Sequence, residues 1–247
     1  PYSESWNIGV QRQLGSNYVG ELAYAGSRNI HLIYGYNPQE VLPGPATVPT
    51  SQRLTIPALY NARTITEIDP RNMSNYHGLQ AKLEKRLSNG LQFLASYTWA
   101  KSLDYGGTAA SGGGAVGNPQ TITNFKAGYG RSGFDATHRF VGNWLYETPF
   151  GVGRRYLNHG LLARVVGGWN LSGIATLQTG LPFTVYLSDG VTNGAPSWPD
   201  RIASGELSNH GPSKWFDPTA FAAPSTPRYG NSGRGILNGP GIVNFDL

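Results

Sequence analysis

The sequence predicts an all-β protein, and more narrowly a fragment of an antiparallel transmembrane β-barrel with long extracellular loops. Three observations support this fold class. Several segments alternate apolar and polar residues over the length that a tilted strand needs to cross a bilayer. Charged residues make up only 13% of the chain, whereas aromatic residues make up 12%. The connections between the predicted strands alternate between short and long, as they do in barrels that cross a bacterial outer membrane.

The clearest predicted element is a β-hairpin from Tyr76 to Lys101. Its first strand alternates apolar and polar side chains from Leu79 to Arg86, and its second does so from Leu91 to Trp99. A period of two is typical of a strand with one apolar face. Asn89-Gly90 lies between the strands and readily adopts the positive φ angles of a tight hairpin turn. The hairpin alone does not distinguish a soluble core from a surface that faces lipid.

Alternation also predicts the remaining strands. In the first, Trp6, Ile8 and Val10 share one face, and in a later one Trp169 and Leu171 do. Each of these strands therefore has one apolar face and one polar face. In chain order they are residues 6–14, 18–26 with an extension to 34, the hairpin, 138–150, 169–178 with an extension through 182–187, and 243–247.

The connections follow a regular order of lengths. Gly15-Ser16-Asn17 and Asn89-Gly90 are short turns, and 151–168 is a medium connection in which 161–166 has the pattern of a helical turn. The other three connections are long and rich in Gly or Pro, and long ordered loops are usually functional. We interpret the run Gly112–Gly114 as a flexible loop rather than a phosphate cradle, because no Gly-Lys-Ser/Thr follows it. The long connections are residues 37–74, 102–137 and 188–241.

The overall composition excludes several classes of protein. The chain has 247 residues and no cysteine, which excludes a disulfide framework, a thiolate metal site and a cysteine nucleophile. The net charge of +5 comes from scattered lysines and arginines, so we expect no nucleic-acid partner. No apolar run approaches the roughly 18 residues of a transmembrane helix, whereas strands cross a bilayer by alternation alone.

No constellation of residues indicates catalysis or metal binding. Ser132, Asp135 and His138 are close in sequence, but a catalytic triad is defined by geometry and the segment lacks Gly-x-Ser-x-Gly. We interpret Asp135 and His138-Arg139 as residues that hold a loop where it enters a strand. None of the five histidines has metal-ligand spacing, and loop acids such as Asp189 lack the Asp-x-Asp-x-Asp pattern of a calcium loop. We therefore expect no cofactor and no enzymatic activity.

Aromatic residues in the last long connection are the candidates for contact with an extracellular ligand. Trp198, Trp215 and Phe216 present ring faces on which a ligand could stack. The alternative is that these rings pack the long loop against itself.

Short motifs occur in order along nearly the whole chain. They include Trp6-Asn7, Tyr24-Ala25-Gly26, the segments 75–80 and 97–102, His138-Arg139-Phe140, Pro149-Phe150-Gly151, the segment 178–183, Trp215-Phe216-Asp217-Pro218 and Gly239-Pro240-Gly241. Each motif alone has little specificity, but their order and number are specific. Together they resemble the C-terminal barrel portion of TonB-dependent outer-membrane receptors. The similarity is to the Oar-like branch, whose members often carry an N-terminal carboxypeptidase-regulatory-like domain.

The resemblance implies a barrel of about 22 strands that surrounds a plug. Such a barrel would sit in the outer membrane of a Gram-negative bacterium and import a bulky extracellular ligand with energy from the TonB complex. The partners implied are therefore the lipid bilayer, the TonB complex and an unknown ligand. The chain shows no TonB box or plug and begins and ends in strands, so we expect residues 1–247 to be a partial barrel domain of a longer polypeptide.

The resemblance also assigns an environment to each face of the predicted strands. The apolar face should contact lipid through Leu79, Leu83, Phe93, Tyr97, Trp99, Trp144 and Leu171. The polar face should line the lumen and contact plug, water or ligand through Gln80, Lys82, Glu84, Arg86, Arg139, Asn143 and Gln178.

Three other functions stay open on the sequence alone. A passive porin-like protein would lack the plug and the TonB box upstream. A secreted β-sandwich that binds glycans through its loop aromatics would be soluble without detergent. An enzyme such as a glycosidase needs a pair of carboxylates, and nothing pairs the polar-face residues Glu21, Glu84 and Glu147.

Overall fold

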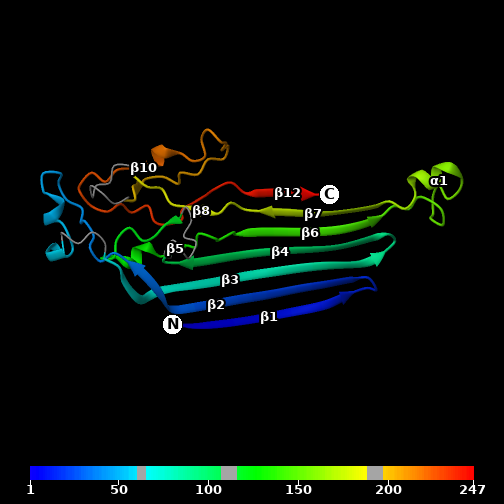
Figure 1. Ribbon diagram of the computed structural model, residues 1–247, viewed down its shortest axis with the longest axis horizontal. Coiled ribbons are helices and arrows are strands. Elements are labelled where there is room, and N and C mark those ends of the chain that lie inside the picture. Colours follow the sequence, from blue (N-terminus) through cyan, green and yellow to red (C-terminus); the bar gives the residue numbers. More distant parts are fainter. Residues whose placement is uncertain (60–64, 107–115, 188–196) are drawn as a thin grey trace.

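The main feature of the molecule is one eight-stranded antiparallel sheet (Figure 1). The computed structural model describes residues 1–59, 65–106, 116–187 and 197–247. Seven strands cross the sheet in the order β1-β2-β3-β4-β6-β7-β12, and the short β5 pairs with the end of β4. This order is the up-and-down meander of a barrel wall. The bounds are β1 Tyr2–Leu14, β2 Tyr18–Tyr36, β3 Glu67–Ser88, β4 Leu91–Asp104, β5 Gly130–Arg131, β6 His138–Glu147, β7 Asn170–Gln178 and β12 Ile242–Asp246.

Strand pairing places the apolar residues on one face of the sheet and most polar residues on the other. Directly paired residues of antiparallel strands lie on the same face. The sheet therefore has the two unlike faces that the alternation predicted, and this prediction is confirmed. One row of pairs contains Val10, Leu22, Ala81, Tyr97, Phe140, Leu177 and Val243. A neighbouring row on the opposite face contains Gln11, Glu21, Lys82, Ser96, Val141, Thr176 and Asn244.

The apolar face is largely exposed. Val10 and Val243 are each 70% exposed, and Trp99 and Leu171 are more than half exposed. A soluble sandwich would cover such a face with a second layer to remove it from water. An exposed apolar face of this extent is instead what a strand wall presents to lipid.

The shorter connections lie at one end of the sheet and the longer connections at the other (Figure 1). The two tight turns and the β6–β7 connection, which contains α1 (Gly160–Val166), lie at the right of the view. The connections β2–β3, β4–β6 and β7–β12 lie at the left. In outer-membrane barrels the short turns are periplasmic and the long loops extracellular, which orients the strands. Short 3₁₀ helices in the long loops are Thr50–Gln52, Pro57–Leu59, Phe125–Gly128 and Pro218–Ala220.

None of the helices among the described residues has the length and the apolar character needed to cross a bilayer.

The most deeply buried side chains belong to the long connections rather than to the strands of the sheet. Trp198, Leu237 and Val116 are each at most 2% exposed. Two small ribbons support this part of the fold. They pair β8 (Pro182–Phe183) with β11 (Leu237–Asn238), and β9 (Asp200–Arg201) with β10 (Phe221–Ala222).

Of the predicted strand boundaries, one is confirmed and others need correction. The β2 extension is confirmed and reaches Tyr36, with an irregular register around His31, whose φ is 59°. The next connection is shorter than predicted, because β3 already begins at Glu67. The extension of β7 is wrong, because the strand stops at Gln178 and residues 182–183 pair with β11 instead. The run Gly112–Gly114 and Asp189 lie outside the described residues.

The β3–β4 turn has the geometry that its sequence predicted. Asn89 and Gly90 both have positive φ angles, 51° and 76°, as a two-residue hairpin turn requires. Lys85 is buried just before the turn, and its amine donates to the carbonyls of Ser88 at 2.9 Å and Leu91 at 2.7 Å. Strand pairing places Lys85 at the end of the apolar face, and these hydrogen bonds satisfy its ammonium group there.

Gly90→Ala is expected to destabilise the folded protein more than Gly15→Ala. Both glycines have positive φ, which costs a residue with a Cβ about 1–2 kcal/mol. A Cβ on Gly90 would also lie 2.7 Å from the Glu147 carbonyl oxygen, whereas one on Gly15 meets nothing within 4 Å. Urea titration of the full-length protein in liposomes measures the difference. Equal midpoints for the two variants would contradict the expected clash.

Candidate functional site

The three long connections pack against one another at the extracellular end of the sheet. Glu40 in the first connection accepts a hydrogen bond from the Thr121 hydroxyl in the second at 2.7 Å. Gln120 in the second donates to the carbonyl of Gly230 in the third at 2.8 Å. The connections therefore form one structure, the loop layer, made of the described parts of residues 37–66, 105–137 and 179–241.

Arg234 attaches the loop layer to the sheet. Its side chain is 0% exposed and donates to both the carboxylate and the carbonyl of Asp104 at the end of β4. It also donates to the carbonyls of Gly128 at 2.8 Å and Gly130 at 3.2 Å. One guanidinium thus binds the last loop, the middle loop and a strand end together, which its five donors in a fixed fork make possible.

Ser132, Asp135 and His138 do not form a catalytic triad. The Ser132 hydroxyl bonds to the Ser102 hydroxyl at 2.8 Å, and His138 Nδ1 bonds to the Tyr97 hydroxyl at 2.7 Å. Asp135 accepts from Arg131 Nε at 2.6 Å and from the Ser102 amide at 2.7 Å. Asp135 therefore fixes the loop where it enters β6, as the interpretation of the sequence predicted.

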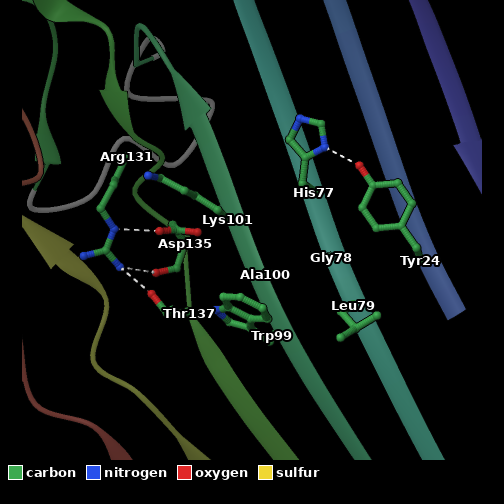
Figure 2. Close-up of a pocket in the computed structure, with 10 residues that line it drawn as sticks. All are labelled: Tyr24, His77, Gly78, Leu79, Trp99, Ala100, Lys101, Arg131, Asp135 and Thr137. Atoms are coloured by element: carbon green, nitrogen blue, oxygen red, sulfur yellow. Dashed lines mark hydrogen bonds and ion pairs between the residues drawn. The ribbon is translucent and has the colours of Figure 1, made fainter. Parts of the chain in front are cut away.

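Figure 2 shows a hollow of about 590 Å³ at the extracellular end of the apolar face, where β2, β3 and β4 meet the segment that carries Asp135. Tyr24 and His77 form one side of it, with the tyrosine hydroxyl 2.6 Å from His77 Nδ1. Trp99 of β4 and Leu79 of β3 also line it. Polar groups and rings thus border the apolar face at this end.

Aromatic and polar side chains border the apolar face at both of its ends. At the extracellular end they are Trp6, Tyr24, His77, Trp99, Lys101 and His138. At the periplasmic end they are Tyr18, Lys85, Phe93, Trp144 and Tyr146. Lys101 and Leu91 mark these ends on β4, about 34 Å apart along the strand. A tilt of about 40° reduces that to roughly 26 Å, which matches the apolar band of outer-membrane barrels.

Pairing places six of the seven polar-face candidates on one surface. Gln80, Arg139 and Gln178 lie in one row together with Thr98, and Lys82 lies in the next row. The row after that contains Glu84 and Asn143. Arg86 is the exception, because it falls in the register shift between Lys85 and Ser88 and pairing does not place it on this face.

Two of the three loop aromatics line a second hollow. Trp215 and Phe216 border a space of about 570 Å³ at the extracellular end, together with the polar-face residue Gln178. The Trp215 indole N–H donates to the Asn238 carbonyl at 2.6 Å, which fixes the ring in place. Trp198 is only 1% exposed and packs inside the loop layer, so its expected contact with an extracellular ligand is corrected to a structural role.

The remaining wall of this hollow was not expected from the sequence. It is made of Gly133, Leu181, Pro182, Phe183, Gly239, Pro240 and Ile242. A Cβ on Gly180 would lie 1.7 Å from the Gly239 carbonyl oxygen, so the two segments approach more closely than other residues allow. The Gly-Leu-Pro and Gly-Pro-Gly motifs were the available signal, since such motifs mark close backbone contacts.

Burial of Glu40 raises the pKa of its carboxyl group, while hydrogen bonds from Thr121 and the Ile122 amide lower it in part. A carboxyl whose pKa is raised on folding stabilises the folded state most at acidic pH, and that stability is lost as pH rises through the raised value. We expect the contact between the first two loops to tighten on acidification.

Hydrogen exchange of the loop layer between pH 5 and 8, corrected for intrinsic exchange rates, measures this effect. Glu40→Gln should remove most of the pH dependence, because glutamine does not titrate. The same pH response in Glu40→Gln and in the parent would contradict the assignment to Glu40.

The exposed apolar face, its bordering aromatic rows and the separation of short turns from long loops define the wall of a membrane-spanning β-barrel. The family described as outer membrane beta barrel domain matches residues 1–247. The chain belongs to this family, and its location is the outer membrane of a Gram-negative bacterium. Searches of curated proteins and of solved structures each found no significant match.

Proposed function

We propose that this chain forms part of the barrel of an active transporter that imports a bulky ligand with energy from the TonB complex. The ordered motifs support this proposal, since they resemble Oar-like TonB-dependent receptors along nearly the whole chain. In this proposal residues 1–247 form one part of a barrel that has about 22 strands in total, and the polar face of the sheet lines the lumen of that barrel. The TonB complex would act through a plug carried elsewhere in the polypeptide.

The observation that carries the proposal is the position of the hollow lined by Trp215, Phe216 and Gln178. It lies where the loop layer meets the extracellular end of the polar face. Its wall is mostly apolar, with the Gln178 amide as a polar group, which suits a ligand with both ring surfaces and hydrogen-bonding groups. A ligand held there would be next to the row of Gln80, Arg139 and Gln178.

The polar face offers a path along the sheet rather than a catalytic centre. Below the hollow, Lys82 lies directly opposite Glu21 on one side and Ser96 on the other, so this row carries one charge of each sign beside neutral polar groups. Hydrated polar side chains of this kind offer a ligand several exchangeable contacts in place of one tight site, which permits passage. The specificity of the transporter would then come from the loop layer.

The first test separates active transport from a passive pore. The full-length parent protein is placed in planar bilayers and in whole cells, and cells are given labelled siderophore, cobalamin, oligosaccharide and peptide compounds. A plugged active transporter should show little steady conductance and an uptake that a protonophore abolishes. Steady conductance together with protonophore-insensitive uptake would support the passive porin-like alternative.

Trp215→Ala is expected to weaken binding of the imported compound by about tenfold, since stacking on one aromatic side chain contributes about 0.5–1.5 kcal/mol beyond the area it buries. The readout is the concentration that gives half-maximal uptake by whole cells. Trp169→Ala is the matched control, because this exposed tryptophan lies at the opposite end of the sheet. Equal effects of both substitutions would show that the hollow does not bind the imported compound.

A further inference from the structure

The β6–β7 connection, residues 148–169, differs from the other periplasmic connections. The other two are the tight polar turns Gly15-Ser16-Asn17 and Asn89-Gly90. This one carries α1, contains Arg154, Arg155 and Arg164, and has no aspartate or glutamate. A simple reversal of the chain does not require such a segment.

The connection is folded rather than extended. The Gly151 amide donates to the Tyr156 carbonyl at 3.1 Å, and the Tyr156 amide donates to the Pro149 carbonyl at 3.0 Å. Ala163 of α1 is buried against a close approach of Gly151 and Gly167, where a Cβ on Gly167 would lie 2.6 Å from the Gly151 Cα. The segment therefore presents a defined surface.

That surface is strongly apolar and exposed. Leu161 is 80% exposed and Val152 is 73% exposed, and Leu162, Val165 and Trp169 are each more than 60% exposed. A seven-residue helix does not hold such side chains in water without a reason, because their exposure is unfavourable.

The apolar surface continues into the face of the sheet that contacts lipid. The Trp169 indole N–H donates to the Val165 carbonyl at 3.0 Å, which ties the end of α1 to the start of β7. Leu171, two residues further on, pairs with Tyr146 on the apolar face. The connection thus begins where the periplasmic border of the apolar face ends.

Two arginines accompany these apolar side chains. Arg155 and Arg164 are exposed, and neither has an ion pair with any described residue. Arg154 differs, because it pairs with Glu147 at 3.0 Å. Exposed arginines beside exposed leucine and tryptophan are the pattern of a segment that lies in the interface of an anionic membrane.

We propose that residues 148–169 form an interfacial anchor, which inserts its apolar side chains into the periplasmic leaflet and binds the phosphate groups of anionic phospholipids through Arg155 and Arg164. Continuity with the lipid-facing surface and the absence of acidic residues favour lipid over a protein partner. This anchor depends on membership of the outer-membrane family and not on the transport function.

Insertion is tested with the full-length protein in liposomes of phosphatidylcholine and phosphatidylglycerol. Leu161→Cys is labelled with an environment-sensitive fluorophore, which reports one site because this chain has no cysteine and any elsewhere in the parent is replaced. Ser16→Cys in the β1–β2 turn is the control. We expect lipid-borne quenchers to act at position 161 and aqueous iodide to act mainly at position 16. Equal iodide quenching at both positions would overturn the anchor.

Lipid preference is tested with quenchers carried on phosphatidylglycerol or on phosphatidylcholine. Arg155→Gln and Arg164→Gln should each lower the preference for phosphatidylglycerol roughly fivefold, equivalent to about 1 kcal/mol per arginine at an anionic surface. Arg154→Gln should change it less, because Glu147 already pairs with Arg154. Equal quenching by both lipids in the parent protein, or shielding of position 161 only after a periplasmic protein is added, would overturn the proposal.

Discussion

Arg234→Met is expected to detach the loop layer from the sheet while the strands stay inserted in the membrane. The substitution removes the counter-charge of the Asp104 carboxylate, which keeps only the hydrogen bond from the Gly106 amide at 2.7 Å. It also removes the Arg234 hydrogen bonds to the carbonyls of Gly128 and Gly130. Removing one partner of a buried ion pair costs about 3–5 kcal/mol, because the other charge stays buried and unpaired. Local opening of the loop layer should therefore become frequent. Proteinase K treatment of intact cells measures this opening as cleavage within residues 116–137 and 197–241.

The matched control is Arg228→Met in the same connection. Arg228 pairs with Asp200, but its side chain is 48% exposed, so water and salt screen this pair far more than the buried pair of Arg234. We expect cleavage of Arg228→Met to resemble that of the parent. If both variants are cleaved at the same rate, Arg234 does not have the anchoring role that its contacts indicate.

Leu83→Arg is expected to destabilise the folded protein in a bilayer by about 2–4 kcal/mol, the cost of an arginine near the midplane of a barrel. Leu83 lies opposite Gly20 and Ala95 on the apolar face, between the two bordering rows of aromatic residues. The guanidinium of an arginine at position 83 would lie in lipid, because Gly20 and Ala95 beside it offer no side-chain hydrogen-bonding group. Urea titration of the full-length protein in liposomes measures the loss.

Gln80→Arg is the control for charge alone. Gln80 is on the same strand but on the polar face, opposite Thr98 and Ala23. A cation there reaches water, so its effect should stay within about 0.5 kcal/mol. Equal stability of Leu83→Arg and the parent would show that the apolar face does not contact lipid.

The two substitutions act on separate parts of the molecule. Leu83 belongs to a sheet whose stability depends on the bilayer, whereas Arg234 belongs to a layer with buried side chains of its own. Loss of the loop layer should therefore leave the protein in the membrane, and under the proposed function it should abolish recognition of the ligand. Loss of lipid contact should lower the amount of folded protein.

The strands and their two faces could be predicted from the sequence, because alternation with a period of two is a local property. Leu79, Tyr97 and Trp144 lie on one face and Gln80, Lys82 and Asn143 on the other without any knowledge of the neighbours. The turn at Asn89-Gly90 was equally local, since two adjacent residues with positive φ define it. The predicted position of Arg86 on the polar face is not supported by the pairing, because Arg86 lies in a register shift and such a shift depends on the partner strand.

The loop layer was decided only by the tertiary structure. Arg234 binds Asp104 across 130 residues of chain, and no pattern in the sequence encodes a contact at that separation. Trp198 and Trp215 looked alike in the sequence, yet one is buried and the other lines a hollow with Gln178. The physical reason is that burial of a loop side chain depends on which distant backbone groups surround it. The sequence by itself determined a strand wall with one face for lipid, and folding determined which loop side chains are buried and which line a hollow.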